Sequence, residues 1–176
     1  MILTGNEIIK EQASGRILFS EFDPARATTN SYDLKLGRRL LRYTESTLDP
    51  RRENSYEMLE IPDEGFRLDA GEFVLGETAE MLGSEHYVPL IHAKSGTARL
   101  GLFVHVTADL IDIGSYGKST LQLFATLPVT IYPGMLIAQV TFWKPLGEIE
   151  LYAGKYAGST GPMPSLSYRD TVAAVR

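Results

Sequence analysis

Cysteine is absent from this 176-residue chain, and charged residues make up only 22% of it. The chain therefore cannot form a disulfide, and it lacks the P-C-x-x-C half of the metal site that zinc-dependent nucleobase deaminases use. The formal net charge of -5 leaves no basic footprint for a DNA or RNA backbone. We expect no nucleic-acid polymer as a partner. A small anionic ligand stays compatible with this charge, because a local cluster of cations is enough to bind one.

Long hydrophobic runs are also absent. None approaches the roughly 18 to 20 residues of a membrane span. The first seven residues, MILTGNE, have neither a basic start nor a signal-length apolar stretch. We therefore expect a cytoplasmic protein with no membrane partner. With 44% hydrophobic residues, the chain is long enough for one domain with a sizeable core, and we expect a single domain over residues 1–176.

The pattern of apolar residues predicts a mainly β fold. A capping box, Thr4-Gly5-Asn6-Glu7, precedes Ile8 and Ile9, and the segment stops at Gly15, which predicts one short helix. Brief apolar runs bounded by turn signals then continue to about residue 143, and they predict strands at 31–36, 72–77, 88–92, 120–124 and 136–142. We expect a barrel or sandwich of short antiparallel strands, interrupted by a helical turn within 95–101.

The end of the chain has a different composition. From Tyr152 onward, Gly, Ser and Pro become frequent and the apolar period is lost. Residues 152–176 are therefore expected to form an extended tail, loosely held unless it closes over a ligand or a neighbouring subunit. Two arginine pairs, Arg38-Arg39 and Arg51-Arg52, are interpreted as solvated turn charges rather than ligand contacts.

Two segments combine hydroxyl groups, cations and glycine. Lys94-Ser95-Gly96-Thr97-Ala98-Arg99 places two cations and two hydroxyls within six residues, beside a glycine that allows close backbone approach. Gly158-Ser159-Thr160-Gly161 follows Lys155 and offers backbone N–H donors. Both segments suit phosphate groups. The first is equally compatible with a charged turn between strands, and the second, taken alone, with a flexible tail.

A single carboxylate stands out in an apolar segment between them. If Asp112 is buried, it must be paired, linked to a metal or functional, because burying a bare carboxylate is costly. An Asx turn that caps a hairpin is the alternative. His86, His92 and His105 do not have metal-ligand spacing, and we interpret His105 as a structural histidine with its hydrogen bonds satisfied.

Several blocks of the sequence together resemble the dCTP deaminase and trimeric dUTPase superfamily. They are residues 30–37 (NSYDLKLG), 94–102 (KSGTARLGL), 104–117 (VHVTADLIDIGSYG), 133–139 (PGMLIAQ), 154–156 (GKY) and 161–165 (GPMPS). The resemblance implies a distorted antiparallel β-barrel of the dUTPase-like, β-clip type, with a short N-terminal helix and one short internal helix. It also implies a homotrimer whose sites lie at subunit interfaces and take a deoxynucleoside triphosphate with Mg²⁺.

The resemblance also implies roles for single residues. Ser95 and Arg99 would contact phosphates, with Ser95 near the reacting centre as well, and Asp112 would meet the sugar 3′-hydroxyl. A hairpin around Ala108 would present backbone groups to the base edge. The remaining substrate-binding candidates are Lys94, Gly96, Thr97, Gln139, Tyr152, Lys155 and Ser159.

The chain departs from the deaminases of this superfamily at Gln122. They carry a glutamate there and use it to move protons during attack on cytosine C4, whereas an amide has no useful pKa near neutrality. Such acid–base catalysis is typically worth about 10²–10⁴-fold. The amide has a donor and an acceptor, so it matches uracil or, when flipped, cytosine. The Lys94-Ser95-Gly96 segment and the glycine-rich 158–161 patch are closer to dUTPases, while Lys155-Tyr156 is as in deaminases.

The leading hypothesis is therefore a dUTP diphosphatase that forms dUMP and pyrophosphate. Asp112 would orient or deprotonate the attacking water, and Ser95, Arg99, Gln139 and Lys155 would hold the phosphates. The magnesium ion would be held mainly by the triphosphate, without direct protein ligands. A dCTP deaminase, or a bifunctional dCTP deaminase and dUTPase, is the alternative, and a catalytically silent nucleotide-binding trimer is the third reading. We treat dTTP as a candidate inhibitor.

Overall fold

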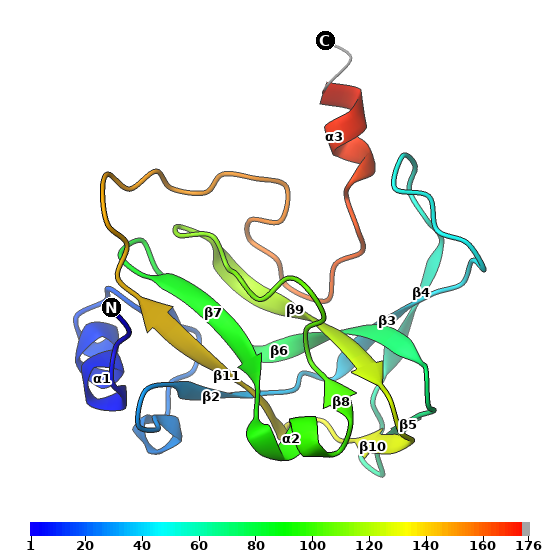
Figure 1. The fold of residues 1–176 in the computed structure, drawn as a ribbon, viewed down its shortest axis with the longest axis horizontal. Coiled ribbons are helices and arrows are strands. Elements are labelled where there is room, and N and C mark those ends of the chain that lie inside the picture. Colours follow the sequence, from blue (N-terminus) through cyan, green and yellow to red (C-terminus); the bar gives the residue numbers. More distant parts are fainter. Residues whose placement is uncertain (174–176) are drawn as a thin grey trace.

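The computed structural model describes residues 1–173 and is mainly β (Figure 1). Its helices are α1 (Gly5–Ala13), the 3₁₀ turn η1 (Pro24–Arg26), α2 (Ser95–Arg99) and α3 (Tyr168–Ala173). Its strands are β1 (Leu18–Phe19), β2 (Tyr32–Lys35), β3 (Arg39–Tyr43), β4 (Tyr56–Glu60), β5 (Phe66–Leu68), β6 (Phe73–Gly83), β7 (Val88–Ala93), β8 (Leu102–Phe103), β9 (Tyr116–Ala125), β10 (Val129–Ile131) and β11 (Leu136–Trp143).

The strands form antiparallel sheets around one core. The largest sheet has the order β4-β3-β6-β9-β8, with β1 paired to β6, and a second sheet has the order β2-β11-β7. Strands β5 and β10 form a separate pair. This arrangement confirms the expected distorted antiparallel β-barrel, in which the hydrogen-bonded strands do not close into a ring.

Side-chain alternation explains how β9 serves both the core and a site. Leu121, Leu123 and Ala125 are fully or almost fully buried, whereas the intervening Gln122 and Phe124 are only half-buried. Successive side chains on a strand point to opposite faces, so one face of β9 packs into the core and the other is left for function. Each fully buried leucine contributes roughly 1.5–3 kcal/mol to folding.

The predicted elements correspond to observed ones, with three differences. The expected helix is α1 and the helical turn is α2, but the side chain of Thr4 makes no capping hydrogen bond at the start of α1. The short helix α3 was not expected within the tail. The interpretation of Arg39 as a solvated turn charge is wrong, because this residue begins β3 and forms an ion pair with the buried Glu77.

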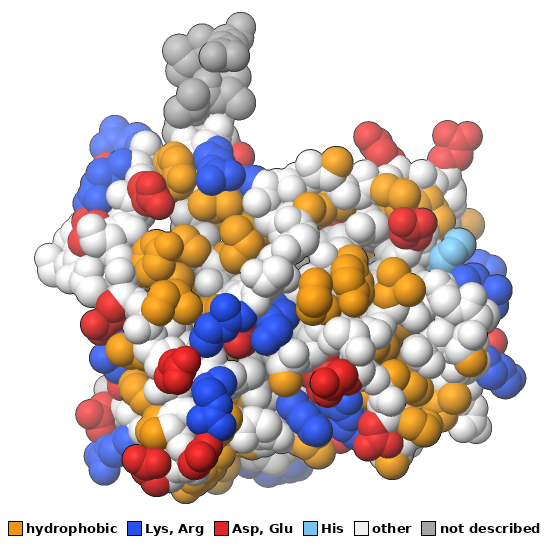
Figure 2. Space-filling model, turned by 180° about the vertical axis from the view of Figure 1, so that it is seen from behind, with side chains coloured by type: hydrophobic (Ala, Val, Ile, Leu, Met, Phe, Trp, Pro, Cys, Tyr) orange, Lys and Arg blue, Asp and Glu red, His pale blue; other side chains and the backbone are white. Residues whose placement is uncertain are grey.

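The surface carries mixed charge. On the face drawn in Figure 2, Lys and Arg side chains alternate with Asp and Glu side chains and with small groups of hydrophobic ones. This face therefore has no uniform basic surface. In the part of the chain that the structure describes, no helix is both long enough and apolar enough to span a bilayer.

Candidate functional site

A cavity of about 810 Å³ opens between the segment after β8, strand β9 and the C-terminal tail. We call the segment of residues 104–115 the 104–115 loop and the residues from 152 to 166 the tail. Of the residues singled out from the sequence, the cavity is lined by Ala108, Asp112, Gln122, Tyr152 and Ser159. The structure therefore brings the base-contacting and sugar-contacting candidates together with part of the tail.

Main-chain hydrogen bonds hold the 104–115 loop in place. The N–H of Ile91 on β7 donates to the carbonyl of Asp109 over 2.9 Å, and the N–H of Ile111 donates to the carbonyl of Pro89 over 3.0 Å. Gly114 turns the chain with a φ of 89°, a conformation that favours glycine. The expected hairpin at 104–117 is thus a loop followed by the start of β9, with a single bridge between Leu90 and Leu110.

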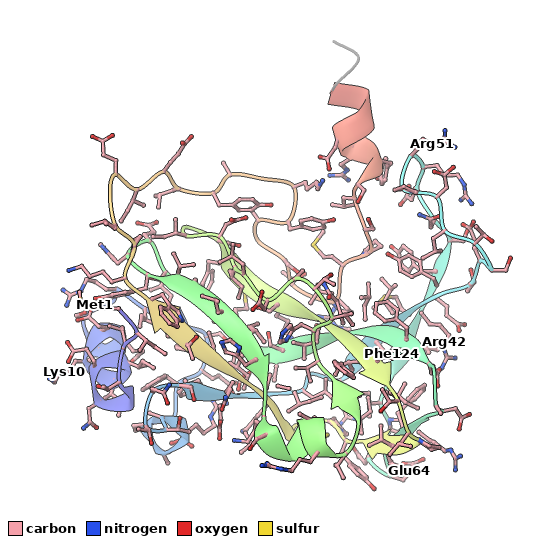
Figure 3. All side chains as sticks on the ribbon, in the orientation of Figure 1. Met1, Lys10, Arg42, Arg51, Glu64 and Phe124 are labelled. Carbon is pink, nitrogen blue, oxygen red and sulfur yellow. The ribbon has the colours of Figure 1, made fainter. Side chains whose placement is uncertain are left out.

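Gln122 links this loop to β9. Its main-chain N–H donates to the carbonyl of Val104 over 2.9 Å. Its side-chain Oε1 accepts hydrogen bonds from the N–H groups of Val106 at 3.1 Å and Thr107 at 3.4 Å. Phe124, labelled in Figure 3, lies two residues further on the same strand and also lines the cavity. Gln122 therefore shapes the loop as well as facing the cavity.

Asp112 lies at the cavity but is exposed. Its carboxylate makes no hydrogen bond or ion pair within residues 1–173, and its main-chain carbonyl accepts from the N–H of Ser115 over 3.1 Å. The premise that this carboxylate is buried is wrong for a single chain, and the turn uses the backbone rather than an Asx side chain. A free, exposed carboxylate at a cavity wall is available to a water molecule, a sugar hydroxyl or a hydrated cation.

The histidines differ from the interpretation given above. Nδ1 of His105 is buried without a hydrogen-bond partner, so the reading of this residue as satisfied is wrong. Its ring lies edge-on to that of His92, with centroids 6.3 Å apart. Burial lowers the pKa of His92, and the neighbouring His105 lowers it further. His105, unlike His92, is among the residues that line the cavity.

Hydrogen bonds hold the tail against the rest of its own chain. The N–H of Tyr152 donates to the carbonyl of Ile113 over 2.8 Å, and the N–H of Lys118 on β9 donates to the carbonyl of Ser159 over 2.8 Å. Arg39 donates to the carbonyl of Thr160. In Figure 1 the tail arches above β7 and β9 before α3 projects from the body. These contacts hold the tail against its own chain, where it forms part of the cavity wall.

Further residues that anchor the tail were not among the site residues expected from the sequence. Met163 donates its N–H to Oγ1 of Thr120 over 3.1 Å, and Ser165 donates its N–H to the hydroxyl of Tyr43 over 2.7 Å. The buried Glu77 pairs with Arg39 at 2.9 Å and with Lys118 at 3.2 Å. These partners are far apart in sequence, so only the strand register brings them beneath the tail.

The phosphate candidates of the 94–99 segment do not line this cavity, and neither do Gln139 and Lys155. Lys94 forms an ion pair with Asp33, and Arg99 donates to the carbonyl of Ser95 over 3.3 Å within α2. Gly96 and the buried Thr97 also lie outside the cavity. So do Gln139, whose side-chain oxygen accepts from the hydroxyl of Ser31 at 3.4 Å, and Lys155, which pairs with Asp170. Within one chain, the phosphate candidates of the 94–99 segment therefore lie apart from the base candidates, whereas Tyr152 and Ser159 of the tail share the cavity with them.

The carboxylates bear on the question of a metal. Within the described residues, no group of three or more His, Cys, Asp or Glu side chains is arranged to hold an ion. Asp33 has a buried Oδ1 without a hydrogen-bond partner, although its other oxygen pairs with Lys94. Mg²⁺ in nucleotide sites usually keeps several waters and takes only one or two carboxylates besides the phosphates. The described residues therefore do not form a dedicated cage for such an ion.

Comparison with known proteins identifies similar chains of the same length. Residues 2–145 match the family described as dCTP deaminase-like. The chain is 41% identical to the "dCTP deaminase, dUMP-forming" of Clostridium beijerinckii, over 97% of this chain and 98% of that protein. It is 42% identical to the protein of the same name from Cytophaga hutchinsonii, over the same shares of both chains.

A solved structure supports the fold. The chain aligns with the 2′-deoxycytidine 5′-triphosphate deaminase of Agrobacterium tumefaciens with a TM-score of 0.63 and 22% sequence identity. The match covers 80% of this chain but only 47% of that one, so this chain spans about half the length of its structural relative. At this identity the likeness concerns the fold alone.

Proposed function

The chain belongs to the dCTP deaminase-like family, and we propose that it is a dUMP-forming enzyme that converts dCTP through dUTP to dUMP. The observation that carries this proposal is the similarity to relatives named dCTP deaminase, dUMP-forming, which extends over 97% of the chain. It favours the bifunctional reading over a dUTP diphosphatase alone, which was our leading hypothesis from sequence. The coarser conclusion, an enzyme that acts on nucleotides, does not depend on this choice.

The proposed reaction has two hydrolytic steps. Water first replaces the amino group at cytosine C4 and releases ammonia, and a second water then attacks the α-phosphate of dUTP and releases pyrophosphate. We propose that Asp112 orients or deprotonates the second water, because its exposed carboxylate has no partner in the described chain. The base would lie in the cavity beside Gln122, under the tail.

The separation of the two groups of candidates supports a site shared between copies. Ser95 and Arg99 lie on α2, outside the cavity that holds Asp112 and Gln122. We propose a homotrimer in which the α2 segment of one copy, with Lys94 and Gln139, supplies the phosphate contacts for the cavity of its neighbour. Each copy would then contribute its cavity to one site and its α2 segment to the site of a neighbouring copy.

Magnesium remains part of this proposal. Bound to the triphosphate, the ion would offset phosphate charge during pyrophosphate release. Asp112 is the candidate to hold it through water, because the exposed carboxylate is free at the cavity wall. Arg99 and Lys155 would supply positive charge around the phosphates once freed from their contacts within the chain.

Gln122 favours a second candidate function, a dUTP diphosphatase that does not deaminate. The amide cannot accept the proton of water or pass one to ammonia, and both of its loop contacts use it as an acceptor of main-chain N–H groups. On the loop that faces the cavity, the ionisable side chains are His105, Asp109 and Asp112. Deamination would have to move its protons through these groups, through other ionisable residues of the cavity such as Lys118, or through water.

A product assay distinguishes the candidates. The purified protein is incubated with magnesium and either dCTP or dUTP, and nucleotides, ammonia and pyrophosphate are each measured. The bifunctional proposal predicts dUMP, ammonia and pyrophosphate in equal amounts from dCTP. Formation of dUMP from dUTP alone would leave only the diphosphatase, and Gln122→Glu should then gain ammonia release. Binding of both nucleotides without turnover would contradict both proposals and indicate a silent nucleotide-binding protein.

A further inference from the structure

The orientation of the Gln122 amide is set by the loop that packs against it. Its Oε1 accepts from the main-chain N–H groups of Val106 at 3.1 Å and Thr107 at 3.4 Å. Its Nε2 donates to nothing in the described part of the chain and is not among the buried polar atoms that lack a partner. The oxygen therefore points to the loop, and the NH₂ group is left for the cavity that the residue lines.

A rotated amide is disfavoured by the same contacts. Turning the group by 180° would aim the NH₂ at the N–H groups of Val106 and Thr107, so that donors would face donors. Both main-chain groups, which lie at exposed positions, would lose this acceptor, and a typical hydrogen bond contributes about 0.5–1.5 kcal/mol. Gln122 therefore offers the cavity a donor only, although a glutamine in isolation offers both kinds of group.

We propose that Gln122 selects nucleotides whose base has a carbonyl at C4, uracil or thymine, over cytosine, which has an amino group there. This rests on the proposed function for the presence of a pyrimidine in the cavity. A carbonyl oxygen at C4 accepts from Nε2, whereas an amino group at C4 would place its own N–H donors opposite the N–H donors of Nε2. dCTP remains a ligand, and the uracil nucleotide that deamination would produce is held more tightly for the second step.

A carboxylate at the same position would act in the opposite sense. In a Gln122→Glu chain, one oxygen would still accept from Val106 and Thr107, so the loop would keep its contacts. The second oxygen would be an acceptor facing the cavity. It would pair with the amino group of cytosine and repel the carbonyl of uracil. The substitution replaces a hydrogen-bond donor with an acceptor in a side chain of nearly the same shape.

The experiment measures affinity rather than turnover. The dissociation constants of the α,β-imido analogues of dUTP and dCTP are measured with magnesium by rapid mixing, within the first turnover, for the unaltered chain and for Gln122→Glu. The short time is needed because the imido bridge blocks attack on the α-phosphate but not deamination at C4. We expect the unaltered chain to prefer the dUTP analogue by about 10-fold, because the C4 carbonyl of uracil accepts from Nε2, whereas the amino group of cytosine places a donor opposite a donor. Gln122→Glu should reverse the preference, and Gln12→Glu on α1, which makes the same charge change outside the cavity lining, should keep it.

The outcomes separate this inference from the proposed function. Equal affinities, or a preference for the dCTP analogue in the unaltered chain, would overturn the inference even if the product assay shows dUMP. A dUTP preference that Gln122→Glu fails to alter would also overturn it, because a group other than Gln122 would then recognise the substituent at C4. Selective binding of the dUTP analogue, reversed by the substitution, would support the inference even if no turnover is found.

Discussion

Gly117→Ala tests whether the docked tail is needed for activity. Gly117 lies in β9 directly beneath the tail, and a Cβ built on it would stand 2.8 Å from both the main-chain N and O of Ser159. Neither atom belongs to a flexible side chain, so the tail itself would have to move. The same movement would lengthen the hydrogen bond from the N–H of Lys118 to the carbonyl of Ser159, which is now 2.8 Å.

The expected size of this effect follows from those two contacts. Overpacking costs about 1–3 kcal/mol and a lost hydrogen bond about 1 kcal/mol, so the docked tail would be destabilised by about 2–4 kcal/mol. Since each 1.4 kcal/mol is tenfold, the docking equilibrium should fall by about 30- to 1,000-fold. The penalty applies only when the tail is docked, so the melting temperature of the body should change little.

Two measurements check this prediction. We expect kcat/KM for dUTP to fall at least about tenfold and the tail to be cleaved faster in limited proteolysis. In a control chain that ends at residue 151, Ser159 is absent and the Gly117→Ala substitution should have no further effect on kcat/KM. Unchanged turnover and unchanged cleavage in the complete chain would refute the reasoning.

Two other predictions concern the shared site and the acid stability of the fold. Asp112→Asn and Arg99→Ala chains should each be inactive on dUTP, but refolding them together should restore about a quarter of the sites, since a random mixture pairs an intact Asp112 with an intact Arg99 from another copy at that frequency. No recovery would contradict a site built from two copies. Hydrogen bonds from Arg16 and Tyr87 lower the pKa of the buried Glu11 from 4.5 to about 2, against the opposing effect of burial. Because the folded-state pKa is lowered, this stabilisation is present above pH 4.5 and is lost as the pH falls toward 2. Glu11→Gln should therefore lower the free energy of unfolding at pH 7 by about 1–3 kcal/mol and flatten its dependence on pH in that range; an unchanged pH profile in chemical denaturation would contradict it.

The sequence carried enough information for the fold because the strands have clear boundaries. Apolar runs such as 120–124 and 136–142 lie inside β9 and β11, and the turn signals between them mark real chain reversals. The boundaries were less accurate than the elements. β9 extends back to Tyr116, since its first residues pair with β6 through Lys118 and Gly117 although they are not part of an apolar run.

Some of the candidate site residues lie together in the structure, but their surroundings were not predictable from the sequence. Asp112, Ala108 and Gln122 line one cavity. Local sequence gave no means to see that Asp112 is exposed, because its apolar neighbours suggested burial. The role of Arg39 was also hidden, since its partners, Glu77 and the carbonyl of Thr160, are distant in sequence.

Gln122 shows why a side chain has to be seen in place. From sequence, its amide matches either uracil or cytosine, because the group is free to turn. In the structure, the N–H groups of Val106 and Thr107 fix the oxygen and remove that freedom. The selectivity thus depends on main-chain donors in a loop, and no pattern of residue types encodes their positions directly.

The most direct test of the account is a crystal structure of the protein with α,β-imido-dUTP and magnesium. The account predicts that the uracil lies in the cavity with its C4 carbonyl at hydrogen-bond distance from Nε2 of Gln122, and that the phosphates contact Ser95 and Arg99 of a neighbouring copy. A nucleotide bound outside the cavity, or phosphates held without any residue of α2, would contradict it.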